Sequence, residues 1–106
     1  MIYALEEDGE TPVRVTFDRI QEIDWEFVEK NKRIAKDTIN GLDGSTVFLS
    51  TDHSFGGGAP VLWETMVFVK GTVNEIFCDR YTSREDAVVG HKAALAKIAS
   101  GEIHSG

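Results

Sequence analysis

Residues 61–69 constrain the fold most, because this run is apolar at both its odd and its even positions. Side chains alternate between the two faces of a strand, so a short run of this kind indicates a central strand covered on both faces. Residues 46–51, rich in β-branched and aromatic side chains, predict a second strand. A turn at Gly71-Thr72 would return the chain through residues 74–81 as a third. The pattern therefore predicts an antiparallel meander.

The flanking segments predict an α+β fold. Residues 33–40 are short and mixed, as expected of an edge strand that ends in a turn at residues 42–44. The start of the chain alternates weakly around Asp8-Gly9, which predicts a hairpin. Apolar spacing predicts one helix of about four turns, capped by Thr16 and running to near Asn31, and a second from Ser83 to about Ala99.

The fold expected for this order of elements is a sheet of three to four strands, with a possible N-terminal hairpin and both helices packed on one face. A chain of 106 residues is long enough for one core, so residues 1–106 form a single domain. The polar tail, residues 100–106, is expected to be disordered.

The charge of the chain is uneven. The formal net charge is −7, and residues 1–30 hold nine acids against three bases. The first predicted helix would present Glu22, Glu26 and Glu29 on one face. An acidic chain gains little from attraction to phosphate, so neither nucleic-acid nor membrane binding is expected, whereas a partner protein with a basic surface is.

Two further observations limit the chemistry. Cys78 is the single cysteine, which excludes an intramolecular disulfide and a cysteine-rich zinc site, and we expect a core or edge thiol there. No cofactor is expected. The first residues lack the basic start and apolar core of a secretion signal, so a cytoplasmic location is expected.

The loop at residues 52–60 is the most unusual segment. Gly56, Gly57 and Gly58 permit positive φ angles and close approach of a ligand, and freed N–H groups would suit an anion. No Lys-Ser/Thr pair follows, so the loop is not a P-loop, and a plain hairpin tip is the alternative. His53 is read as a polar turn residue, with a ligand or base as the alternatives. Phe55 is either an exposed anchor or folded back onto the sheet.

Glu64 lies on one face of the buried strand, between Leu62 and Met66. A buried carboxylate is costly unless it is paired or protonated. If the glycine loop closed symmetrically, Asp52 would share this face, and if Gly71-Thr72 set the next turn, Asp79 would lie opposite Glu64. Candidate binding residues are therefore Asp52, His53, Phe55, Gly56, Gly57, Gly58, Trp63 and Glu64. No spacing matches an established metal motif, and no catalytic set is assigned. His91, in the apolar stripe of the second helix, is read as a hydrogen-bonded core histidine.

The central motifs are T-V-F-L at residues 46–49, D-H-S-F-G-G-G-A-P at residues 52–60 and W-E-T-M-V-F at residues 63–68. With Asp79-Arg80-Tyr81 and Gly90-His91, they resemble a family of small uncharacterised proteins encoded mostly in bacteriophages and in bacterial genomes carrying mobile elements. The resemblance covers roughly residues 31–92. It implies a genomic setting and assigns no catalytic residue.

Three functions follow as hypotheses. The favoured one is a stoichiometric binding protein of a phage or mobile element that inhibits a host defence complex, such as a nuclease, with its acidic helix in a basic groove. The alternative is a small metal-dependent hydrolase or nucleotide-binding protein that uses Asp52, His53, Glu64 and the glycine loop. The third is a homodimer in which Trp63 and Phe55 pack across the interface.

Overall fold

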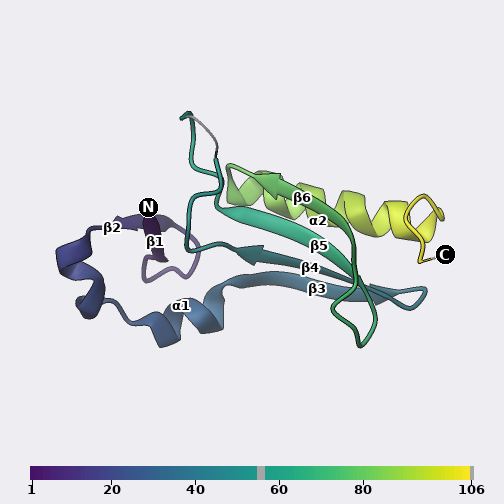
Figure 1. Cartoon of the computed structure of the whole chain (residues 1–106), viewed down its shortest axis with the longest axis horizontal. Helices are drawn as coiled ribbons and strands as arrows, with labels where there is room; N and C mark the ends of the chain where they lie inside the picture. Colours follow the sequence, from purple (N-terminus) through teal and green to yellow (C-terminus); the bar gives the residue numbers. More distant parts are fainter. Residues whose placement is uncertain (55–56, 106) are drawn as a thin grey trace.

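The chain forms a two-stranded hairpin and a four-stranded antiparallel meander, with one long helix packed on the meander (Figure 1). This computed structural model describes residues 1–54 and 57–105. The predicted α+β class is confirmed. In chain order the elements are β1 (Ile2–Leu5), β2 (Pro12–Val15), the 3-10 helix η1 (Phe17–Glu22), α1 (Trp25–Asn31), β3 (Arg33–Ile39), β4 (Leu42–Phe48), β5 (Trp63–Val69), β6 (Glu75–Tyr81) and α2 (Arg84–Ala99).

The meander has the strand order β3-β4-β5-β6, so β5 is central and β3 is an edge strand, as predicted. Helix α2 packs across all four strands, whereas α1 lies at the end of the sheet against β1 and β3 (Figure 1). The expectation that both helices cover one face therefore holds for α2 alone. Ser83 caps α2 as predicted, because its hydroxyl accepts the N–H of Asp86 at 3.0 Å.

The first predicted turn of the meander is misplaced, and the second is in the predicted place but longer than predicted. The first lies at Asn40 and Gly41, which have φ angles of 51° and 76° and join β3 to β4 as a two-residue hairpin turn. Gly44 lies inside β4, where a Cβ atom would come within 3.2 Å of a methyl carbon of Leu95. Because Gly44 has no side chain, α2 can lie close to the sheet at this position. The second connection spans residues 70–74, longer than the predicted two-residue turn.

The single helix predicted from Thr16 to Asn31 is also wrong. Ile23 has an extended backbone with φ −83° and ψ 132°, which separates η1 from α1. Asp24 starts the second helix, because its carboxylate accepts the N–H of Phe27 at 3.1 Å. The side chain of Thr16 makes no capping hydrogen bond. The three glutamates of the expected acidic face are therefore divided between two short helices.

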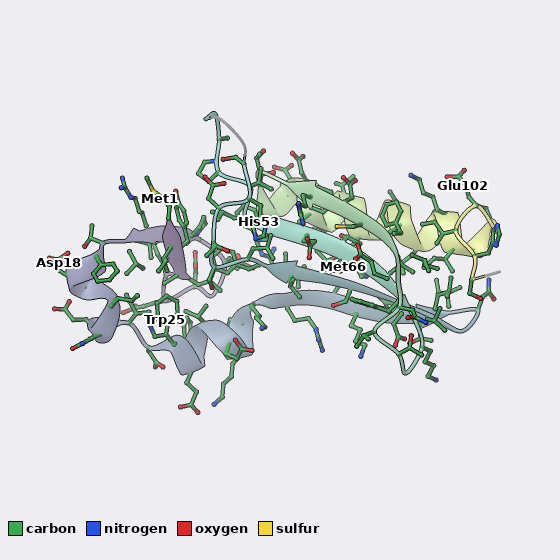
Figure 2. The ribbon with its side chains drawn as sticks, in the orientation of Figure 1. Met1, Asp18, Trp25, His53, Met66 and Glu102 are labelled. Atoms are coloured by element: carbon green, nitrogen blue, oxygen red, sulfur yellow. The ribbon has the colours of Figure 1, made fainter. Side chains whose placement is uncertain are left out.

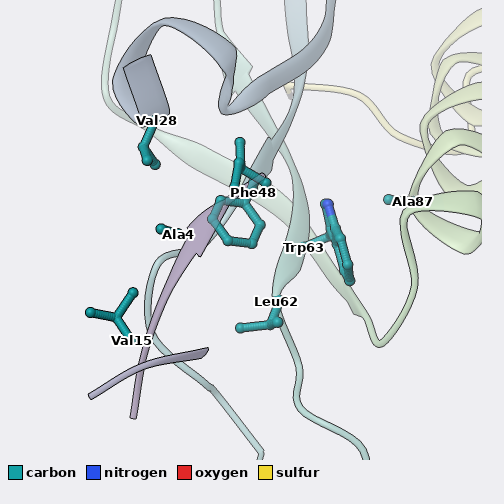
Figure 3. Close-up of a cluster of buried hydrophobic side chains, with 8 residues drawn as sticks. Ala4, Val15, Val28, Phe48, Leu62, Trp63 and Ala87 are labelled. Atoms are coloured by element: carbon teal, nitrogen blue, oxygen red, sulfur yellow. The ribbon is translucent and has the colours of Figure 1, made fainter. Parts of the chain in front are cut away.

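Two apolar clusters hold the molecule together. The first joins the N-terminal hairpin and α1 to the start of the meander and of α2 (Figure 3). Trp63, 3% exposed, packs edge-on against Phe48 in this cluster, with ring centroids 5.8 Å apart. Trp63, which the homodimer hypothesis places at an interface, is therefore a core residue. The second cluster, between the far end of the meander and the last turns of α2, comprises Leu42, Val67, Ala94, Ile98 and Ile103.

The tail is ordered further than expected. Ile103 is 9% exposed, packs in the second cluster and donates its N–H to the carbonyl of Lys97 at 3.1 Å. The prediction of a disordered tail over residues 100–106 is therefore wrong at Ile103, which buries an apolar side chain. Over the described residues, none of the helices has both the length and the apolar character needed to cross a membrane.

Candidate functional site

Asp52 closes the base of the glycine loop. One carboxylate oxygen accepts the N–H groups of Ser54 and Val61, each at 2.8 Å, and the other accepts the Ser54 hydroxyl at 2.9 Å. The N–H of His53 donates to the carbonyl of Val61 at 3.0 Å. These backbone hydrogen bonds hold the pKa of Asp52 below its usual value of 3.8. Its lone pairs are directed at the loop's own backbone, so Asp52 acts as a loop clasp.

The glycine loop itself is only partly described. Gly57 and Gly58 have φ angles of 106° and 88°, a region that side chains rarely adopt, so glycine is required there by conformation. Phe55 and Gly56 lie outside the described residues, and the predictions made for them stay predictions. Nε2 of His53 lies 3.4 Å from the Thr51 hydroxyl, which fits a polar turn residue.

The partner of Glu64 is Arg80, not Asp52 or Asp79. The strand register pairs residue 64 with residue 80, one position away from the predicted pairing with Asp79, so both side chains lie on the face away from α2. Nε of Arg80 contacts the Glu64 carboxylate at 2.9 Å, and the Cys78 thiol donates to the same oxygen at 3.5 Å. Burial, followed by the charge of Glu64, raises the pKa of Cys78 to about 11. The grouping of Asp52 with Glu64 is also wrong, because it depended on a symmetric closure of the glycine loop, whereas the register of β4 and β5 pairs Glu64 with Val47.

A chain of polar side chains, buried at every position except Asp37, links α2 to the sheet, and beyond His91 no sequence pattern indicated it. Nε2 of His91 donates to the Asp37 carboxylate at 2.8 Å, and Nδ1 pairs with the Thr46 hydroxyl at 2.7 Å. Thr46 in turn pairs with the Thr65 hydroxyl at 2.6 Å. The prediction of a hydrogen-bonded core histidine is confirmed.

The order carboxylate, imidazole, hydroxyl is the one used to activate a nucleophile. Here, however, Thr46 and Thr65 are both 0% exposed, and His91 is 4% exposed. A hydroxyl that no substrate can reach performs no attack. The chain instead satisfies the hydrogen bonding of its own buried members, Thr46, Thr65 and His91, and fixes how α2 lies on the sheet, between the two apolar clusters.

The hollow that stands out lies in the N-terminal unit, which we define as β1, β2, η1 and α1. This acidic hollow has a volume of about 330 Å³ and an apolar floor. Glu7, Glu22 and Asp24 are its charged residues, and no basic residue lines it. Its floor consists of Ala4, Leu5, Val13, Ile23, Phe27 and Val28. The hollow forms only because the hairpin packs against the short helix α1, a contact that local sequence patterns do not reveal.

The acidic residues around this hollow differ in how far they are neutralised. Three ion pairs occupy the glutamates of the predicted acidic face: Glu22 with Arg19 at 2.8 Å, Glu26 with Lys30 at 3.8 Å, and Glu29 with Lys32 at 2.7 Å. Within the described part of the chain, Glu7 and Asp24 form no ion pair. Among the residues that the structure describes, two carboxylates at the hollow, Glu7 and Asp24, are thus without an ion pair, whereas each glutamate of the predicted helix face has one.

The sequence-predicted site residues do not converge. Asp52 and His53 belong to the base of the loop, Glu64 to the face of the sheet away from α2, and Trp63 to the core. Among the described residues, no three His, Cys, Asp or Glu side chains gather in a way that would hold a metal ion. No family model matches the chain, and comparisons with curated proteins and with solved structures found no match.

Proposed function

We propose that this chain is a stoichiometric binding protein that docks a basic surface of a partner protein on its N-terminal unit. The observation that carries the proposal is the acidic hollow, an apolar cavity whose charged residues are all carboxylates. An apolar floor supplies binding free energy by burial, while rim charges select a cationic partner and speed its encounter. Residues 1–30 also hold most of the excess negative charge of the chain.

The partner class in this proposal is a host protein with a basic, nucleic-acid-binding groove, such as a nuclease of a bacterial defence complex. The resemblance of residues 31–92 to phage and mobile-element proteins supports that setting. In this proposal the expected contact is the rim and not the helix face, because Glu22, Glu26 and Glu29 each have a cation of their own. An ion pair that must be broken first gives little net attraction.

The metal-dependent alternative has less support. It needs Asp52, His53 and Glu64 in one group, whereas Asp52 accepts hydrogen bonds from its own loop and Glu64 pairs with Arg80. Neither carboxylate is free to receive a cation without dismantling a structural contact.

The test is affinity capture from a bacterial lysate with the wild-type chain, followed by titration of the purified captured protein. The variant Glu7→Lys/Asp24→Asn removes the uncompensated rim charge, and Asn still caps α1. The control Glu75→Lys/Asp86→Asn makes the same charge change on β6 and α2. We expect the rim variant to bind at least about tenfold more weakly, equivalent to about 1.4 kcal/mol, and the control to bind as wild type. Equal binding by all three proteins would contradict the proposal.

A further inference from the structure

A second hollow adjoins the acidic one and carries the opposite charge. This arginine hollow, of about 250 Å³, is lined by Val13, Arg14, Val15, Thr16, Arg19 and Ile23. It shares Val13 and Ile23 with the acidic hollow. The two hollows therefore form one surface with a common apolar centre, a negatively charged half and a positively charged half.

Phe17 adds an aromatic side chain next to the arginine hollow. It is 88% exposed, although large aromatic side chains are normally at least half covered, and it follows Thr16 at the start of η1. In Figure 2 the neighbouring Asp18 marks the end of the molecule opposite Glu102. An exposed aromatic residue beside apolar hollows is the usual composition of an interface hot spot. We call the two hollows and Phe17 together the N-terminal patch.

We propose that a second copy of this chain occupies the N-terminal patch, with Phe17 of each protomer in the acidic hollow of its partner. A two-fold axis brings the same patch of two subunits together, so residue i meets residue j and j meets i. A patch with one acidic and one basic half is self-complementary under that operation. Arg14 and Arg19 would then face Glu7 and Asp24 across the axis.

The charges agree with this arrangement. Arg14 forms no ion pair within the described residues, and neither do Glu7 and Asp24. Arg19 uses its Nε–H on Glu22, which leaves its other N–H groups free to donate. Pairing thus gives three uncompensated groups a partner of opposite sign.

This inference rests on the proposed function, because both use the N-terminal patch. It adds that a second copy of the chain occupies the patch before a host protein does. A basic host protein would then compete with the second copy. Trp63, the residue first expected at a dimer interface, is buried in the core and takes no part.

Sedimentation of the full chain from micromolar to millimolar concentration tests the inference. We expect a species of twice the 11.7 kDa chain mass, and a dissociation constant raised at least tenfold by Phe17→Ser. Val73→Ser, at a side chain 91% exposed on the loop after β5, is the matched control and should dimerise as wild type. Both substitutions lie at exposed positions, so urea midpoints should stay unchanged and report correct folding.

A charge swap decides whether the contact is between chains. Arg14→Glu alone and Glu7→Arg alone should each be monomeric, because like charges then meet across the axis. An equal mixture of the two should form a heterodimer. In that heterodimer the two substituted side chains have opposite charges and meet each other, while the unchanged Glu7 of one chain meets the unchanged Arg14 of the other.

Wild type that stays monomeric throughout, or a Phe17→Ser variant that still dimerises, would overturn the inference. A monomer that still binds a basic host protein through Glu7 and Asp24 would overturn the dimer alone and leave the proposed function standing.

Discussion

The substitution Gly90→Ala has two opposing effects on stability: alanine has the higher helix propensity, but its Cβ atom would clash with Tyr81. Gly90 lies in the interior of α2, where alanine would be favoured over glycine by about 1 kcal/mol. A Cβ atom there would lie 2.2 Å from the hydroxyl oxygen of Tyr81 and 2.3 and 2.4 Å from two of its ring carbons. Normal contacts are about 3.5–4.0 Å, so the ring would have to move by more than about 1 Å.

The steric contact should dominate. Overpacking of this kind costs about 1–3 kcal/mol, and Tyr81 has little room because its ring packs against the first apolar cluster. Taking the upper end and subtracting the helix preference, we expect Gly90→Ala to lower the free energy of unfolding by about 2 kcal/mol. With a urea dependence of about 2 kcal/mol per molar, the midpoint falls by about 1 M. Urea titration followed by tryptophan fluorescence measures this directly.

The same substitution in a Tyr81→Val variant shows whether the clash with Tyr81 causes the effect. In Tyr81→Val the ring is absent, so Gly90→Ala should change sign and stabilise the protein by about 1 kcal/mol. Val89→Ala, at a neighbouring side chain that is 63% exposed, should change stability by no more than about 0.5 kcal/mol. If Gly90→Ala stabilised the wild-type chain, the packing of Tyr81 beneath α2 would be refuted.

Two further predictions concern titratable groups. The pKa of Asp52 is lowered in the fold, so its ionised form stabilises the protein above the unfolded pKa of 3.8, and this contribution is lost as pH falls through the folded value. Thermal unfolding temperatures measured from about pH 5 down to about pH 3 should therefore fall more steeply for wild type than for Asp52→Asn. If the unfolding temperatures of the two proteins fell in parallel with pH, the role of Asp52 as a loop clasp would be contradicted. Because the pKa of Cys78 is raised from 9.0 to about 11, iodoacetamide at about pH 8 should alkylate it about a hundredfold more slowly than a free cysteine. Glu64→Gln should speed that reaction, as followed by mass spectrometry, and an unchanged rate would show that Glu64 does not hold the thiol protonated.

Local patterns predicted the elements that depend on nearby residues. The capping serine of α2, the apolar stripe of that helix and the central position of β5 follow from spacing and burial, and the structure has all three. The first helix failed because its apolar spacing continues across Ile23, whereas Asp24 captures the N–H of Phe27 and starts a new helix. Periodicity alone does not record such a restart.

The position of the first meander turn and the register of β5 and β6 depend on tertiary contacts, which local sequence patterns do not contain. Gly44 resembles a turn residue in sequence, yet its hydrogen leaves space for Leu95 of α2, and the turn forms at Asn40-Gly41 instead. A slip of one residue then placed Glu64 opposite Arg80. Because of this one-residue shift in register, the buried carboxylate of Glu64 forms an ion pair with Arg80.

The candidate site was the least predictable part. Glu7 and Asp24 lie far apart in the sequence and meet only where the hairpin packs on α1. The sequence located the excess acid in the first thirty residues but not which acids stay uncompensated, because that depends on the ion pairs of Arg19, Lys30 and Lys32.

The most direct test of the central claim is the affinity of the captured host protein for the rim variant Glu7→Lys/Asp24→Asn against the control Glu75→Lys/Asp86→Asn. Isothermal titration at low and at high salt gives both dissociation constants. We expect the rim variant alone to bind at least about tenfold more weakly, and the difference to shrink as salt screens the rim charges. If both variants bind as tightly as the wild-type chain at low salt, the N-terminal unit is not the binding surface.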